Sequence, residues 1–197
     1  MVILNGTGTQ YVYTESFNTL VLNKSAGTMY IPSGHTVACN SYDWEAGAYN
    51  VSGGTFNVLD LTDSGIFGTI TISSGTINYL QDTSQYVDMR CTLNMSGGTF
   101  NINGGNSVSW WGFLNPFTLN MSNGTLYFYQ PINLPSGHIT VENVTGGIIR
   151  TCGGFSCQRN DFTPSGGTLE MYDTVDSHVT MVAGGNLYNL NINKLPV

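Results

Sequence analysis

Charged side chains are scarce in this sequence of 197 residues, where Asp, Glu, Lys and Arg together make up 9% of the chain. Five Lys and Arg face twelve Asp and Glu, which gives a formal net charge of −7 at pH 7. So few cations cannot neutralise a run of phosphates, and we therefore expect no nucleic-acid partner. Disorder is not expected either, because hydrophobic residues reach 41% and aromatic residues 12% of the chain.

Long apolar runs are also missing, so we expect no membrane insertion. The first residues lack the basic segment followed by an apolar one that marks a secretory signal. The sequence opens in coil-like residues and closes in strand-like ones, so we expect one domain, residues 1–197, cut from a longer protein. Few charges beside many hydroxyl and amide side chains favour an extracellular or cell-surface location.

Cysteine and histidine are few. The four cysteines, Cys39, Cys91, Cys152 and Cys157, fit disulfides in an oxidising compartment, and Cys152 and Cys157 are close enough to pair across a small loop. Buried free thiols are an equally good interpretation. The three histidines are isolated in the sequence, so we expect no metal site and no cofactor.

Glycine, by contrast, is abundant and recurs in one motif, seen most clearly in Ser96-Gly97-Gly98-Thr99-Phe100-Asn101. The residue after the glycines marks eight copies: Thr28, Thr55, Thr76, Thr99, Thr125, Ile148, Thr168 and Asn186. These anchors lie 18 to 27 residues apart, with a mean of about 23. A repeat of this size is typical of a solenoid.

The residues around each anchor alternate between apolar and polar, which predicts strands with one buried face. The position after the anchor is always apolar: Met29, Phe56, Ile77, Phe100, Leu126, Ile149, Leu169 and Leu187. Each repeat therefore predicts a strand, a glycine corner, a second strand and a variable return. We predict an all-β fold, a single-stranded right-handed parallel β-helix (β-solenoid) of about eight coils. An antiparallel sandwich is the alternative.

The corner motif and the closing segment Asn186-Leu187-Tyr188-Asn189-Leu190-Asn191-Ile192-Asn193-Lys194 resemble the right-handed parallel β-helix repeats of large secreted bacterial surface proteins. The same fold is used by pectate-lyase-like polysaccharide lyases, by glycosidases, by phage tailspikes and by adhesin segments. The resemblance implies a fold and a polysaccharide theme, but no particular activity.

Two long returns hold all three tryptophans, Trp44 in the first and Trp110 and Trp111 in the second. We expect the returns to be loops at the edge of the coils, where binding residues often lie. Sugar rings stack on aromatic faces while nearby polar groups bind their hydroxyls. The sequence therefore predicts a glycan-binding platform of Trp44, Trp110, Trp111, Tyr42, Tyr129 and Asp43. The alternative is that these rings cover the core.

Charged residues and two series of asparagines complete the candidates. Asp60 and Asp82, with Arg150, are the best candidates for a β-helix lyase or hydrolase site, although their spacing does not repeat at one phase. Arg150 and Glu170 share one phase and are expected to pair. Two series of asparagines, Asn57, Asn78, Asn101 and Asn50, Asn94, Asn120, Asn143, are expected to stack as amide ladders that hold the register or contact sugars.

These observations favour a non-catalytic extracellular surface module, a scaffold or adhesion segment that binds a polysaccharide or cell-surface glycan through its aromatic loops. A polysaccharide lyase or glycoside hydrolase of the β-helix type is the alternative. A self-assembling fibre or sheath subunit is the second alternative, since uncapped ends would favour end-to-end self-association.

Overall fold

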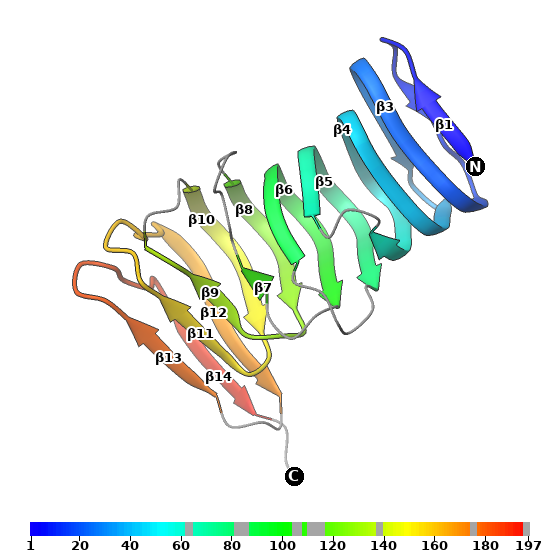
Figure 1. The fold of residues 1–197 in the computed structure, drawn as a ribbon. Helices are drawn as coiled ribbons and strands as arrows, with labels where there is room; N and C mark the ends of the chain where they lie inside the picture. The colour runs from blue at the N-terminus through cyan, green and yellow to red at the C-terminus, as the bar shows by residue number, and fades with distance from the viewer. Residues whose placement is uncertain are drawn as a thin grey trace.

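The computed structural model describes residues 1–61, 65–80, 87–103, 108–109, 117–136, 140–173 and 177–194. These residues form a β-solenoid of about seven turns, with equivalent positions roughly 23 residues apart and no helix. The sequence predicted this architecture with about eight coils. Figure 1 shows the chain advancing from the blue N-terminus to the red C-terminus, which lie at opposite ends of the stack.

The described strands follow one another along the chain. Their bounds are β1 Val2–Asn5, β2 Gln10–Tyr11, β3 Glu15–Pro32, β4 Thr36–Leu61, β5 Gly65–Leu80, β6 Val87–Asn103, β7 Val108–Ser109, β8 Phe117–Phe128, β9 Ile132–Leu134, β10 Thr140–Thr151, β11 Gly154–Cys157, β12 Gly166–Asp173, β13 His178–Met181 and β14 Leu190–Lys194. The longest of these strands bend through a glycine corner, so one strand contributes to two sides of a coil.

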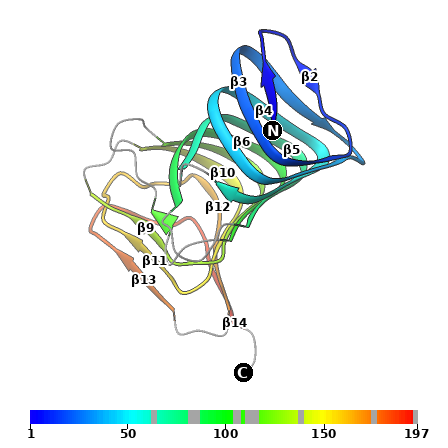
Figure 2. The ribbon, with the colours of Figure 1, turned by 45° about the vertical axis from the view of Figure 1, so that its right-hand side comes forward.

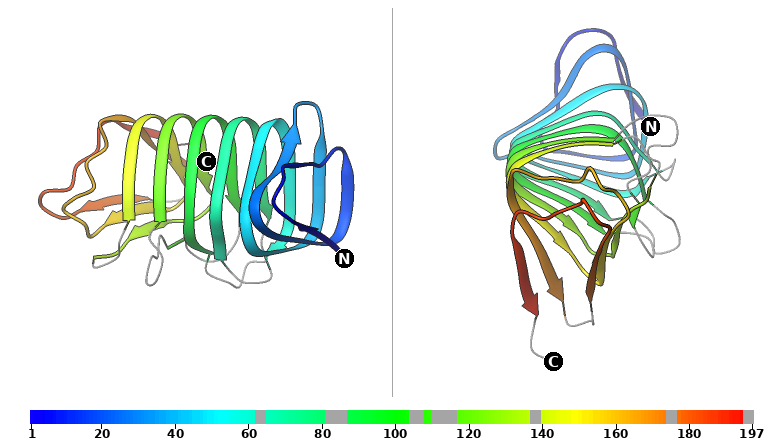
Figure 3. Two further views of the ribbon diagram at one scale, coloured as in Figure 1. Left: turned by 90° about the horizontal axis from the view of Figure 1, so that it is seen from above. Right: turned by 90° about the vertical axis from the view of Figure 1, so that its left-hand side faces the viewer.

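All pairings between the described strands are parallel. The main stack runs β3, β4, β5, β6, β8, β10, β12 and β14, and Figure 3 shows its coils side by side. A second stack of return strands runs β7, β9, β11 and β13, of which Figure 2 shows the last three side by side. Each coil therefore places its residues directly over those of the next, as the repeat predicted.

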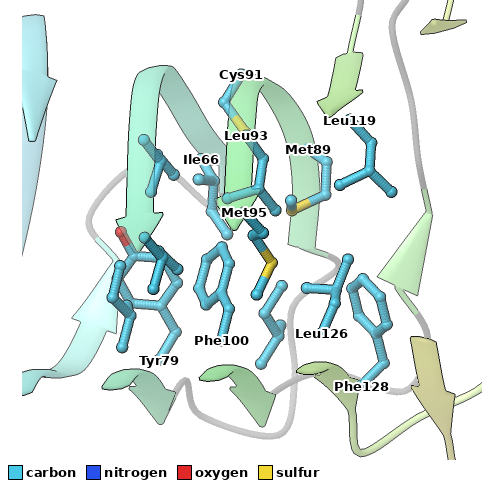
Figure 4. Close-up of a cluster of buried hydrophobic side chains, with 14 of the residues drawn as sticks. Ile66, Tyr79, Met89, Cys91, Leu93, Met95, Phe100, Leu119, Leu126 and Phe128 are labelled. Atoms are coloured by element: carbon cyan, nitrogen blue, oxygen red, sulfur yellow. The ribbon is translucent and has the colours of Figure 1, made fainter. Parts of the chain in front are cut away.

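Columns of same-phase apolar side chains fill the interior. Phe56 pairs with Ile77, Ile77 with Phe100 and Phe100 with Leu126, and all four are fully buried. Figure 4 shows neighbouring members of these columns, such as Phe100 and Leu126, packed against Met95 and Leu93 from the opposite side of the coils. The predicted interior column is confirmed. Burial of each such side chain contributes about 1.5–3 kcal/mol.

Several polar side chains of this core form hydrogen bonds. Thr151 occupies an inward position after Phe128 and is fully buried. Its hydroxyl lies 2.8 Å from the Gln130 carbonyl and 3.1 Å from the Gly154 carbonyl, to which it can donate. Tyr49 and Tyr79, on opposite sides of the coils, share a hydrogen bond between their buried hydroxyls. These bonds offset the cost of removing hydroxyls from water.

Close approach between coils explains why glycine recurs at the corner. Gly75 has a φ of +85°, and a Cβ built on it would lie 2.2 Å from the Gly54 carbonyl oxygen of the preceding coil. A side chain would therefore meet both a strained backbone and a backbone clash. The corner glycine is a requirement of stacking.

Two of the eight predicted anchors are placed in the wrong register. Thr28 pairs with Ala48 and belongs to a different corner from Thr55, whose N–H donates to the His35 carbonyl. In the last coil, Leu169 pairs with Leu190, three residues beyond the predicted Leu187. A Gly-Thr pair marks a corner but does not say which of the corners of a coil it forms, and this is why the first anchor was wrong.

All four cysteines lie in the described residues, and none forms a disulfide. Cys39, Cys91 and Cys157 are buried, while Cys152 is half-buried. The Cys152 thiol lies 2.9 Å from the Tyr172 carbonyl, to which it donates, so it is directed away from a bond with Cys157. Of the two interpretations that the sequence allowed, the structure shows free thiols.

Candidate functional site

The outer surface of the second strand of each coil carries one continuous column of polar side chains. Its members in register are Asn57, Asn78, Asn101, Tyr127, Arg150, Glu170 and Asn191. The amide of Asn78 donates to Asn57 at 2.7 Å, and the amide of Asn101 donates to Asn78 at 2.7 Å. The predicted amide ladder is therefore present, and it ends where Tyr127 begins an aromatic cluster.

The second predicted ladder is present in part. The amide of Asn120 donates to Asn94 at 2.8 Å, and the amide of Asn143 donates to Asn120 at 2.7 Å. Asn50 has the same phase, but Thr71 lies between it and Asn94. Thr71 has no amide to continue the ladder, so Asn50 is separate from it.

We define the aromatic cluster as Tyr127, Tyr129, Tyr172 and Arg150. The rings of Tyr127 and Tyr129 are stacked, with centroids 4.1 Å apart and planes inclined by 28°. The guanidinium of Arg150 lies 4.7 Å from the ring centre of Tyr172 and 5.3 Å from that of Tyr127. Cation–π contacts of this kind contribute about 0.5–2 kcal/mol. The cluster holds Arg150 between two rings and leaves Tyr129 43% exposed.

Glu170, in the next coil, balances the positive charge of Arg150. It forms an ion pair with Arg150, as the shared phase predicted. The other carboxylate oxygen accepts a hydrogen bond from Asn191 at 3.0 Å and one from Asn193 at 3.3 Å. Burial raises the pKa of the Tyr127 hydroxyl, and a hydrogen bond with Cys152 raises it further. The Arg150–Glu170 pair adds no net formal charge beside the rings, and its hydrogen bonds hold donors and acceptors in fixed positions.

Two residues of the predicted platform lie in the core. Tyr42 is 3% exposed and Trp44 is 9% exposed, and both rings pack against Tyr49. Their segment is part of strand β4, paired with β3, and not the loop that the sequence predicted. The sequence appeared to hold an insertion because Thr28 was matched with Thr55. The residue in register with Thr28 is Ala48, so this coil step is 20 residues. Tyr42 and Trp44 therefore match the alternative interpretation, rings that fill the core.

The remaining platform residues do not meet these two. Asp43 lies between Tyr42 and Trp44 on the outer side of β4 and is half-buried. Tyr129 belongs to the aromatic cluster, after β8. Trp110 and Trp111 lie outside the described residues. The structure thus brings Tyr129 together with Tyr127, Tyr172 and Arg150, partners that share its neighbourhood through the coil register.

The candidate catalytic residues are not brought together. Asp60 is exposed near the end of β4, whereas Arg150 is in β10, with β5, β6 and β8 between them. Asp82 lies outside the described residues. In the described ranges, no group of three or more His, Cys, Asp and Glu side chains could hold a metal ion.

One charged cluster was not predicted from the sequence. Glu142 occupies an inward position in register with Leu119, and its side chain is 3% exposed. Arg159, whose side chain is 6% exposed, forms an ion pair with Glu142 and a second with Asp161 at 2.9 Å. Arg159 is one of only five cations, and Asp161 follows it by two residues, which was the available signal. This cluster serves as a buried anchor of the return segment.

No protein-family model, curated protein or solved structure matches this chain. The described residues contain no helix with the length and apolar character needed to cross a membrane.

Proposed function

We propose that this chain is a non-catalytic module of an extracellular or cell-surface protein, in which the solenoid is a scaffold and its outer side chains bind a glycan. The observation that carries the proposal is the exposed Tyr129 ring, held by stacking on Tyr127 beside the Arg150–Glu170 pair. An aromatic face packs on the CH face of a sugar, and fixed polar groups beside it bind hydroxyls. The resemblance to β-helix repeats of large secreted bacterial surface proteins supports the same proposal.

The stacked register suits a scaffold. Each coil contacts its neighbours along the axis, so stability is a sum of similar interfaces and the module can hold surface groups at fixed positions. The separation of Asp60 from Arg150 supports a non-catalytic role over a polysaccharide lyase or hydrolase.

Affinity electrophoresis in gels that contain a polysaccharide tests this proposal. We expect the wild type to be retarded and Tyr129→Ala to lose most of that retardation. Tyr13→Ala is the matched control, because Tyr13 is 57% exposed and contacts the ring of His35 at the other end of the stack. Equal loss in both variants, or no retardation by any polysaccharide, would overturn the binding proposal. Release of oligosaccharide products would favour the enzyme instead.

A second candidate function, end-to-end self-assembly, is favoured by the last coil. Leu190 and Ile192 continue the two inward columns beyond Leu169 and Met171, yet they are 46% and 65% exposed. A further coil or another copy of the chain, packed on this coil, would remove these apolar side chains from water. Light scattering at rising concentration should show oligomers that Ile192→Lys abolishes; a monomer at every concentration would dismiss this function.

A further inference from the structure

A groove of about 320 Å³ follows the second amide ladder on the outside of the solenoid. It crosses four successive coils, from Thr71 to Thr145, and its lining includes Asn94, Ser96, Asn120, Ser122 and Asn143. The lining consists of residues with amide and hydroxyl side chains together with Met95 and Met121, which are buried, and it contains no charged group. The groove exists because side chains of equal phase stack over one another in β5, β6, β8 and β10.

The central amide of the ladder leaves half of its hydrogen-bonding capacity to a ligand. A primary amide has two N–H donors and an oxygen with two lone pairs. Asn120 uses one N–H on Asn94 and one lone pair for Asn143, so one donor and one acceptor are left over. The hydroxyls of Ser96 and Ser122 are exposed beside it. These groups recur at the spacing of the coils, about 4.8 Å.

We propose that this groove binds a neutral, unbranched polysaccharide that lies along the solenoid axis, an inference that rests on the proposed function. A sugar hydroxyl both donates and accepts, which matches amides and hydroxyls that do the same. A polyanion would find no cation in the lining. An extended peptide would find no free strand edge, because β6, β8 and β10 are each paired on both sides.

The groove and the aromatic cluster are distinct surfaces that can be tested separately. Asn120 and Tyr127 are on the same strand, β8, but the corner at Gly124 turns the chain between them. A chain bound in the groove contacts three coils at once through Asn94, Asn120 and Asn143. Its affinity should therefore rise with the number of sugar units until the groove is filled, as expected when linked units bind at neighbouring positions.

Affinity electrophoresis with hydroxyethylcellulose, mannan and polygalacturonate, all on the full chain, tests the inference. Ser122→Leu places an apolar side chain in the groove without removing a ladder amide. Ser16→Leu is the matched control, since Ser16 is an exposed serine of β3 outside the groove. We expect at least one neutral polymer to retard the wild type, Ser122→Leu to weaken that binding about tenfold, and Ser16→Leu to leave it unchanged. Thermal unfolding of each variant shows whether the fold is kept.

The outcomes separate the two proposals. Binding that survives Ser122→Leu but is lost in Tyr129→Ala overturns the groove and leaves the proposed function intact. Retardation by polygalacturonate alone overturns the neutral ligand. Binding by no polymer overturns both. As a second readout, Asn120→Asp places a charge in the groove at nearly constant size, and it should weaken binding of the neutral polymer while the Tyr129 cluster is unchanged.

Discussion

Removing the buried cation of the Glu142–Arg159 pair is expected to destabilise the protein strongly. In Arg159→Met, the Glu142 carboxylate stays at an inward position where its side chain is 3% exposed, and it loses its ion pair with Arg159. Breaking a buried pair in this way typically costs about 3–5 kcal/mol, because a buried charge loses the opposite charge beside it. Urea unfolding followed by far-UV circular dichroism measures the loss as a lower midpoint.

A double variant shows whether burial of the charge is the cause. Glu142→Leu restores the inward column that contains Leu119. Combined with Arg159→Met, it should recover most of the lost stability, because a well-packed apolar pair replaces a buried ion pair at little cost. Asp161→Asn is the matched control: the Asp161 side chain is 66% exposed, so its ion pair contributes under about 1 kcal/mol. A loss of under about 1 kcal/mol in Arg159→Met alone would show that the buried pair contributes little to stability and would contradict this prediction.

Three further predictions concern the ladder, the corner and a buried thiol. Asn78→Ala removes two ladder hydrogen bonds and Asn57→Ala one, so chemical denaturation should show losses of about 2 and about 1 kcal/mol; equal losses would contradict the ladder. Gly75→Ala and Gly34→Ala both place alanine at positive φ, but a Cβ meets the neighbouring coil only at Gly75, so Gly75→Ala should lower Tm more. Burial raises the pKa of the Cys39 thiol from 9.0 to about 12. Between these values the folded state holds a proton that the unfolded chain releases, so this thiol alone should lower stability above pH 9.0 by about 1.4 kcal/mol per pH unit, and the buried Cys91 thiol, whose pKa burial also raises, adds to the fall. Cys39→Ala should flatten this dependence in denaturation curves, and an unchanged slope would argue against it.

The sequence predicted those features in which one residue type recurs at one phase. Phe56, Ile77 and Phe100 were expected to stack and do so, and the amide ladder through Asn78 followed from the same periodicity. The predicted loop position of Trp44 is wrong, because Trp44 lies in a paired strand. A Gly-Thr pair occurs at more than one corner of a coil, and Thr28 does not mark the same corner as Thr55.

The Glu142–Arg159 pair and the place of Tyr129 in the aromatic cluster could not be derived from the repeat. Arg159 reaches Glu142 across a return segment, and returns do not share a phase with the coils. The neighbours of Tyr129 are set by how the chain leaves β8, which the alternation of apolar residues does not specify. The coil periodicity thus determines which side chains stack in one column. The return segments determine which side chains of different columns come into contact.

Distances between spin labels test directly whether same-phase residues stack along one axis. Val141 lies five coil steps from Thr28 and four from Ala48 in one outward column, so the separations should be about 24 and 19 Å at 4.8 Å per step. Pulsed electron paramagnetic resonance on Thr28→Cys/Val141→Cys and Ala48→Cys/Val141→Cys, with the native cysteines replaced, measures both. The distance should be longer for the first pair by about one coil spacing. Distances that do not increase with the number of coils between the labels would contradict it.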